Sequence, residues 1–299
     1  MTDTQNEVFK TPVNKIRLFE HGAPGSQNLK LTRKYYTEDM PDGRVKHIVQ
    51  NITDPDIVPY IPDGIGNSTD RQRIPAVLII PGGAFRRLVY NFEGEDVAKW
   101  LNSMGIAAFV LECRLPSDEH DNAEDVPLID AMRAMRVIRG RAQEFGIDEA
   151  KIGVMGFSAG GFMAALLSTA YESDVYADYK YKDEYDKLSA RPDFAVCSYP
   201  VISIDDCIEA GKRYMSEEQV LERISDSKAK ILHKYNPDKL VRPDMPPVFI
   251  CETDDDRTTL SENSVGFYMA ARKAGVSAEL HIFRTGSTEI GRASCRERV

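Results

Sequence analysis

A regular alternation of short apolar runs with amphipathic segments begins at Pro75, and it constrains the fold more than any other feature of the sequence. Continuously apolar runs of this length are typical of parallel strands that are buried on both faces. The segments between them carry apolar residues at helical spacing. This alternation predicts an α/β fold, with helices on both faces of a mostly parallel central sheet. The apolar runs cover 76–80, 105–111, 151–156, 194–199, 247–251 and 278–283, and the helical segments cover 95–104, 128–145 and 263–274.

Residues 1–70 are polar and rich in turns, with two further strand-like pieces at 29–36 and 45–52. A charged stretch at 203–244 follows the sixth strand as a small helical insertion, and its capping box, Ser216-Glu-Glu-Gln219, predicts the start of a helix. Such an insertion is either a lid that forms part of a substrate pocket or a solvated helical excursion. No internal repeat or linker divides the chain, so we predict a single domain over 1–288.

Charge and cysteine usage exclude several classes of protein. The 38 basic and 47 acidic residues leave a net charge of −9, which argues against binding to duplex nucleic acid or to an anionic membrane. No apolar run reaches the roughly 18–20 residues of a membrane span. The N-terminus lacks the basic and apolar regions of a secretory signal, and the five cysteines form no CxxC pair. We therefore expect a cytoplasmic protein without a disulfide framework.

The sharpest chemical signal is Gly156-Phe-Ser158-Ala-Gly160, which follows a predicted strand directly and precedes a helix-forming run. This is the context of a nucleophile elbow, in which a sharp strand-to-helix turn presents a serine oxygen beside a helix N-terminus. The flanking glycines allow the turn because they bring no Cβ clash. We therefore predict that Ser158 is a nucleophile. The alternative is a serine that merely caps the helix after a glycine-rich turn.

A serine nucleophile of this kind needs an oxyanion hole, made by the backbone amide of the next residue and by another amide from the loop after an earlier strand. Ala159 supplies the first amide. The loop Gly82-Gly83-Ala84 follows the run at 76–80 and supplies the second, because adjacent glycines permit unusual backbone angles. We expect the amides of Gly83 and Ala159, with Ala84 beside them, to hold an oxyanion. The alternative is a simple turn before a helix.

The acid of a catalytic triad is expected after the nucleophile, at the end of a late strand. Asp254, Asp255 and Asp256 follow the run at 247–251 and meet this requirement as a group. A solvated acidic loop is the alternative. A metal site is disfavoured because helix-spaced histidines or further carboxylates are missing. We therefore predict no metal.

These motifs together resemble α/β-hydrolase esterases, in particular bacterial acetyl-xylan and feruloyl esterase-like enzymes, and more distantly the hydrolase domain of prolyl oligopeptidases. The resemblance implies that Asp255, the first aspartate of the pair before the start of the next helix, is the catalytic carboxylate. This chain departs from the family pattern at Cys113-Arg114, where the family has Tyr-Arg, and at Ala84, where the family has a third glycine. The matching segments are 81–85, 95–101, 105–115, 152–161, 255–257, 262–264 and 279–283.

The same resemblance places the catalytic histidine in a Gly-His-Gly loop shortly after the last strand, where this chain has Thr288. His281 is the one histidine that follows Asp255, and it falls inside the last predicted strand. We interpret it as a strand histidine, with the role of general base as the alternative. The segment 289–299 matches a translated sequencing adapter, so we expect the natural chain to continue differently past about Thr288, with the histidine and a final helix. A natural pseudoenzyme is the alternative.

The resemblance implies a serine ester hydrolase that needs no cofactor and acts on acetyl or feruloyl esters of a small molecule or oligosaccharide. Without its histidine, the chain is expected to be a poor esterase. The first rival is a prolyl oligopeptidase-like peptidase, in which Arg257 would hold a substrate carbonyl. However, the roughly 70 residues before the sheet cannot build the propeller of those enzymes. The second rival is a non-catalytic binding protein of the same fold.

Overall fold

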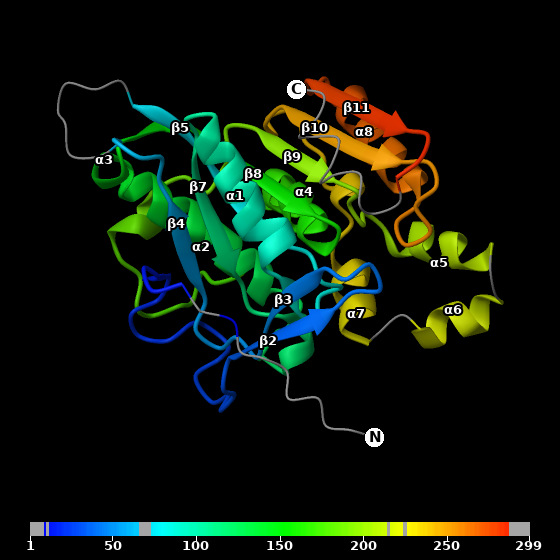
Figure 1. Cartoon of the computed structure of the whole chain (residues 1–299), viewed down its shortest axis with the longest axis horizontal. Coiled ribbons are helices and arrows are strands. Elements are labelled where there is room, and N and C mark those ends of the chain that lie inside the picture. Colours follow the sequence, from blue (N-terminus) through cyan, green and yellow to red (C-terminus); the bar gives the residue numbers. More distant parts are fainter. Residues whose placement is uncertain (1–8, 10–11, 66–72, 214–215, 224–225, 287–299) are drawn as a thin grey trace.

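The computed structural model describes residues 9, 12–65, 73–213, 216–223 and 226–286. Within these residues, an eight-stranded sheet forms the centre of the molecule (Figure 1). Its spatial order is β1 (Ile16–Arg17), β4 (Asp56–Tyr60), β7 (Ala107–Glu112), β5 (Ile74–Ile80), β8 (Ile147–Phe157), β9 (Ala195–Ser198), β10 (Val248–Thr253) and β11 (Ala278–Phe283). The strands from β7 to β11 run parallel, and β1 and β4 pair antiparallel at one edge. The predicted mostly parallel sheet is therefore confirmed.

The register brings the carboxyl ends of the parallel strands to one edge of the sheet. Phe157, Ser198, Cys251 and His281 are partners in one row across β8, β9, β10 and β11. Loops that leave these strands after this row therefore lie at one edge, which is where ligands bind in open α/β sheets.

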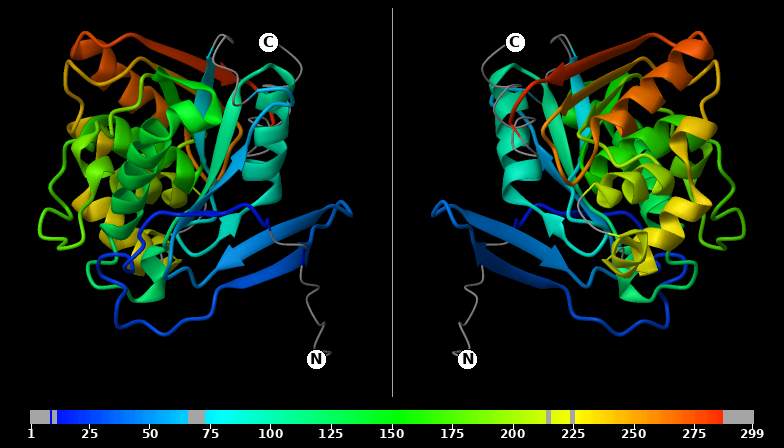
Figure 2. Two further views of the ribbon diagram at one scale, coloured as in Figure 1. Left: turned by 90° about the vertical axis from the view of Figure 1, so that its left-hand side faces the viewer. Right: turned by 90° about the vertical axis from the view of Figure 1, so that its right-hand side faces the viewer.

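Helices cover both faces of the sheet, as predicted. Figure 2 shows α1 on one face and α2, α4 and α8 on the other. α4 is buried along nearly its whole length because it packs between the sheet and α2, which explains why it is apolar on every side. The bounds are α1 (Asp96–Ser103), α2 (Val126–Gly140), α3 (Ala142–Phe145), α4 (Ala159–Ala170) and α8 (Ser261–Lys273).

A three-stranded antiparallel sheet of β2 (Lys34–Asp39), β3 (Val45–Gln50) and β6 (Leu88–Val89) lies beside the main sheet. Its first two strands overlap the predicted strand-like pieces. β4 was not predicted, and it contains Pro59, a residue that sheets usually confine to edge strands, first positions or bulges. Pro59 lies opposite Phe109 of β7, and the described pairing of β1 with β4 is at Ile57 and Asp56.

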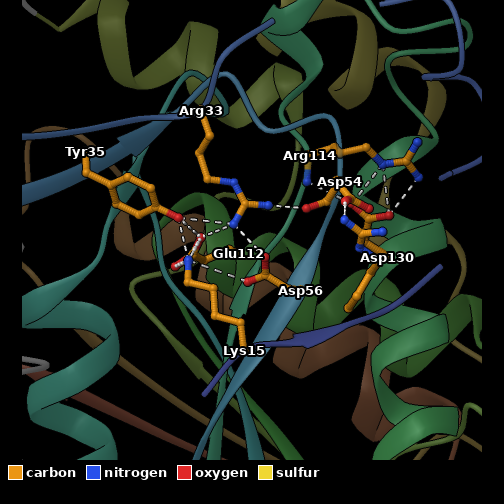
Figure 3. Close-up of polar contacts among 9 residues, drawn as sticks. Lys15, Arg33, Tyr35, Asp54, Asp56, Glu112, Arg114 and Asp130 are labelled. Atoms are coloured by element: carbon orange, nitrogen blue, oxygen red, sulfur yellow. Dashed lines mark hydrogen bonds and ion pairs between the residues drawn. The ribbon is translucent and has the colours of Figure 1, made fainter. Parts of the chain in front are cut away.

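A buried ionic network ties the N-terminal segment to the main sheet (Figure 3). Glu112, at the end of β7, is fully buried and accepts hydrogen bonds from Lys15 Nζ at 2.7 Å, Arg33 Nη1 at 2.6 Å and the Tyr35 hydroxyl at 2.9 Å. Arg33 Nη1 also donates to Asp56 Oδ2 at 2.5 Å. Burial, and then the charge of Glu112, raises the pKa of Asp56 to about 6. Two cations thus balance two acids, and the network has a structural role.

The insertion after β9 folds into α5 (Ile204–Lys212), α6 (Glu217–Arg223) and α7 (Asp226–Lys234), beyond the carboxyl ends of the strands (Figure 1). The Gln219 amide donates to Ser216 Oγ at 3.3 Å and the Ser216 amide donates to Gln219 Oε1 at 3.0 Å, which confirms the predicted capping box. Lys234 Nζ lies 2.7 Å from Asp125 Oδ1, which anchors α7 to the start of α2. A role as a lid stays a prediction.

Candidate active site

Ser158 lies in the turn between β8 and α4, with φ 53° and ψ −117°. A non-glycine residue in this region of φ/ψ space is strained and persists only where the surroundings hold it. The Ser158 amide donates to the Ser198 carbonyl at 3.0 Å, and the Ser158 carbonyl accepts from the Phe162 amide at 3.0 Å and the Val201 amide at 3.4 Å. Backbone of β9, of the loop after it and of α4 therefore fixes a turn that directs a half-buried serine toward the strand-end edge.

Two glycines of the predicted motif are required by close backbone contacts. A Cβ added to Gly156 would lie 2.0 Å from the Gly160 carbonyl oxygen. A Cβ added to Gly160 would lie 2.0 Å from the carbonyl oxygen of Ile80 at the end of β5. Only glycine allows β5, the elbow and α4 to approach so closely.

The loop after β5 passes directly beside the serine. A Cβ added to Gly82 would lie 3.1 Å from Ser158 Cβ. Gly83 has φ 142°, and Ala84 and Phe85 follow with φ 58° and 61°. These angles are rare for residues with a Cβ, so the loop has an unusual course that its hydrogen bonds must maintain.

The predicted oxyanion donors come from two sides of Ser158. Ala159 is the first residue of α4, and amides in the first helical turn have no acceptor within the helix. Gly83 and Ala84 belong to the neighbouring loop. The structure thus brings the predicted serine and both sources of backbone donors together at one edge of the sheet. A helix N-terminus adds partial positive charge there.

Sequence reasoning missed a buried acid in this site. Glu93 belongs to η1 (Asn91–Glu95), a π-helical turn that runs directly into α1. It is buried, its Oε2 accepts the Gly82 amide at 2.8 Å, and its Oε1 accepts the Tyr199 hydroxyl at 3.1 Å. Tyr199 follows β9 and is itself buried, with φ 37°. The one signal in the sequence is an acid followed by glycine just before an amphipathic helix.

The three consecutive aspartates after β10 have different surroundings. Asp256 is buried and accepts the amide of Thr258 at 2.7 Å, so it shapes the loop. Asp254 is exposed. Asp255 is also exposed, and its Oδ1 accepts the amide of Gly286 at 2.9 Å. Asp255 is therefore the carboxylate that contacts the segment after β11, where the resemblance places a histidine.

A further acid, Glu252, is fully buried beneath this loop. Its Oε1 accepts the Thr253 amide at 2.9 Å, and its Oε2 accepts Ser264 Oγ of α8 at 3.3 Å. Burial raises the pKa of the Glu252 carboxyl to about 8. The neighbouring Asn263 accepts the Ile202 amide at 2.8 Å, so α8 holds the loops after both β9 and β10.

His281 lies inside β11, as the sequence predicted. Its Nε2 is 2.6 Å from Glu279 Oε1, and its ring stacks on Phe249 at 5.2 Å between centroids. In the register row described above, three strand spacings separate it from Phe157, which is about 14 Å at the usual spacing. That separation supports its interpretation as a strand histidine. Thr288 and the segment 289–299 lie outside the described residues.

A small cavity adjoins the loop after β5, with a volume of about 20 Å³. Its lining is mostly apolar and includes Gly83, Leu115, Pro116, Ala159 and Met163. A cavity of this size holds about one water molecule or a methyl group. No described residue of 203–244 contributes to its lining.

Other features of the described ranges add no second reactive centre. A hollow of about 620 Å³ is an open groove beside Glu149 and Asp193, near the start of β9 and away from the elbow. In the part of the chain that the structure describes, no three His, Cys, Asp or Glu side chains are grouped as a metal site requires. No helix there has the length and apolar character needed to cross a membrane.

Comparison with known proteins identifies a family and several proteins that are similar to this chain. The BD-FAE family matches residues 65–270, a span that contains Ser158, the loop after β5 and Asp255. The acetylxylan esterase of Xylanibacter ruminicola is 30% identical over 218 residues, which cover 72% of this chain and 41% of that protein. Endo-1,4-beta-xylanase B of Butyrivibrio fibrisolvens is 31% identical over 218 residues, 73% of this chain and 32% of that protein. The chain thus spans less than half the length of these curated relatives.

Among solved structures, an acetyl ester-xyloside bifunctional hydrolase from Caldicellulosiruptor lactoaceticus is similar over 95% of this chain and 90% of its own. The TM-score is 0.69 and the sequence identity is 33%. Together with the family match, this similarity shows that this chain belongs to the BD-FAE family and has the α/β-hydrolase fold.

Proposed function

We propose that this chain is a serine hydrolase of carboxylic esters that removes short acyl groups from carbohydrate. The observation that carries the proposal is the strained elbow, in which Ser158 has φ 53° beside the Gly82-Gly83 loop. Strain at a single serine, flanked by backbone donors at the strand-end edge, is typical of a nucleophile that must be presented to a substrate.

Acylation begins when Ser158 Oγ attacks the ester carbonyl carbon and a general base takes its proton. The carbonyl oxygen becomes an oxyanion, which the amides of Gly83 and Ala159, with Ala84 nearby, stabilise. The tetrahedral intermediate collapses, the base returns the proton to the leaving alcohol, and an acyl-serine remains. Water then attacks the acyl-serine by the same route and releases the carboxylic acid.

Asp255 orients the base and stabilises its protonated form. Its contact with the Gly286 amide supports this role, since the base is expected a few residues further along the chain. Thr288 stands at that position, so the printed chain lacks the imidazole that its geometry would use. Loss of the base costs on the order of 10⁶ in kcat, because the triad acts as a unit.

The cavity beside the loop favours a short acyl group. At about 20 Å³ it is large enough for the methyl of an acetyl group. The names of the relatives, an acetylxylan esterase and an acetyl ester-xyloside hydrolase, support acetylated xylo-oligosaccharide as the substrate. The other half of the substrate, the sugar, would lie toward the open strand-end edge.

The proposal can be tested with the segment that follows the last strand of the Caldicellulosiruptor lactoaceticus hydrolase joined after Gly286, which supplies a family C-terminus. We expect this grafted chain to release acetate from acetylated xylo-oligosaccharide and to cleave p-nitrophenyl acetate faster than p-nitrophenyl butyrate. Met163→Ala enlarges the cavity, so the ratio of the rate on p-nitrophenyl acetate to the rate on p-nitrophenyl butyrate should fall about tenfold. Equal rates on all acyl lengths, or no acetate release, would contradict the proposed substrate class.

A further inference from the structure

Glu93 is a buried acid that contacts the loop of the proposed oxyanion hole, and acylation as written above gives it no role. Glu93 and the serine both lie close to Gly82: a Cβ added to Gly82 would be 2.8 Å from Glu93 Oε2 and 3.1 Å from Ser158 Cβ. A residue with a Cβ therefore does not fit at position 82 beside the carboxylate and the nucleophile. The carboxylate and the serine thus both approach the loop closely at Gly82.

The hydrogen bonds of this loop determine which way its amides point. The Gly82 amide donates to Glu93 at 2.8 Å and is thereby withdrawn from the oxyanion hole. The Gly82 carbonyl accepts the Val89 amide at 2.9 Å. In a trans peptide the next N–H points opposite to that carbonyl, so the Gly83 amide is directed away from Val89. Glu93 and Val89 together fix the peptide plane that carries the Gly83 donor.

The second oxygen of Glu93 extends this support across the elbow. It accepts the Tyr199 hydroxyl at 3.1 Å, and the Tyr199 amide donates to the Cys251 carbonyl at 2.7 Å. β5 and β9 are the two neighbours of β8 in the sheet. One carboxylate thus joins the loops on both sides of the strand that carries Ser158.

The backbone at Glu93 is itself unusual. The Glu95 amide donates to the Tyr90 carbonyl at 2.9 Å, the five-residue spacing of a π-turn. Such turns occur mostly as single interruptions of α-helices and frequently at functional sites. Here the turn places Glu93 and Gly94 beneath the loop, before the regular spacing of α1 begins.

We propose that Glu93 is a positioning residue, whose carboxylate holds the Gly83 amide in the orientation that an oxyanion requires. This inference rests on the proposed function, because it assumes that Ser158 is acylated. A carboxylate suits this task because it offers two acceptor oxygens, one for the Gly82 amide and one for the Tyr199 hydroxyl.

The test uses the chain as printed, with free imidazole as an external base. Intact mass spectrometry follows the rate at which p-nitrophenyl acetate acetylates the protein, and peptide mapping locates the acetyl group on Ser158. We expect Glu93→Ala to lower this rate about 10- to 100-fold without changing the ester concentration at half-maximal rate, since removing an oxyanion donor costs on the order of 10²–10³. Glu93→Gln keeps an acceptor for the Gly82 amide and should retain the rate within about threefold.

Asp118→Asn is the matched control, because Asp118 is another buried acid that accepts a backbone amide, that of Ile52 at 3.2 Å. It should lower Tm without slowing acetylation. The ¹⁵N–¹H signals of Gly82 and Gly83 should shift in Glu93→Ala and not in Asp118→Asn. If Glu93→Ala does not fold, Glu93→Asp withdraws the carboxylate by about 1.5 Å and should also cost at least tenfold.

Two results would overturn the assignment, and they are distinguishable. If Ser158 is acetylated in the parent chain and the rate in Glu93→Ala or Glu93→Asp stays within twofold, Glu93 has a structural role and the proposed function stands. If Ser158 is acetylated neither in the printed chain with imidazole nor in the grafted chain, or if labelling persists in Ser158→Ala, the proposed function is wrong and the role of Glu93 is lost with it.

Discussion

Replacement of Glu252 by glutamine should make this protein more stable at alkaline pH. Glu252 is fully buried, and burial raises its pKa to about 8, against 4.5 for an exposed glutamate. The folded chain therefore binds a proton that the unfolded chain has released between these two pH values. The contribution of Glu252 to the free energy of unfolding is therefore complete below about pH 4.5 and is lost as the pH rises through about 8, because the native state binds more protons than the unfolded state in this range.

The shift sets the magnitude of this effect. A difference of about 3.5 pH units at 1.36 kcal/mol per unit gives at most about 5 kcal/mol, reached above pH 8. Glutamine mimics the neutral carboxyl, keeps an oxygen for the Thr253 amide and does not titrate. We expect Glu252→Gln and the parent chain to differ by less than about 1 kcal/mol at pH 5, and the variant to be several kcal/mol more stable at pH 9.

Urea unfolding followed by circular dichroism at half-unit steps from pH 5 to 9 measures this difference directly. Glu149→Gln is the control because Glu149 is an exposed glutamate. Its free energy of unfolding should equal that of the parent chain at every pH. A constant difference between Glu252→Gln and the parent chain would refute the reasoning, as would a variant that is the less stable protein at pH 9.

Three other substitutions or exchanges have defined outcomes. Gly160→Ala should lower the free energy of unfolding by about 3 kcal/mol, because its Cβ would lie 2.0 Å from the Ile80 carbonyl oxygen. Gly275→Ala, whose Cβ would meet no atom within 4 Å, should lower it by about 1 kcal/mol. Urea titration compares the two variants. Asp130→Ala leaves the fully buried Arg114 guanidinium without its carboxylate, 2.7 Å away in the parent chain, and should cost about 3–5 kcal/mol in the same assay, whereas changing both residues to apolar ones should cost less. In the grafted chain, exchange of 203–244 for a short loop should alter the ranking of a panel of carbohydrate esters more than turnover of p-nitrophenyl acetate; an unchanged ranking would contradict a lid.

Local pattern was enough to predict the central sheet and the elbow. Apolar runs located the strands, and 278–283 was assigned to its residue limits, although β11 lies at the edge of the sheet and is partly exposed rather than buried on both faces. β8 could be joined to the motif at Ser158. The strained turn at Ser158 follows from glycines that the sequence displays. β4 was not predicted, and its pairings with β7 and β1 join segments that lie far apart in the sequence.

Much of the site depends on contacts between distant segments. Glu93 reads as an ordinary acid ahead of an amphipathic helix, and its role appears only when the π-turn brings it against Gly82 and Tyr199. Asp254, Asp255 and Asp256 are equivalent in the sequence apart from the resemblance. Their separation into a loop-shaping acid and one that contacts Gly286 requires the turn after β10 and its neighbour β11.

The most direct test of the central proposal is the rate of p-nitrophenyl acetate hydrolysis by the printed chain and by the grafted chain. We predict that the printed chain is slower by several orders of magnitude, that the graft restores turnover, and that Ser158→Ala abolishes it again. The opposite result is hydrolysis at enzymatic rates by the printed chain that His281→Ala abolishes, which would make His281 the base and contradict the proposed triad.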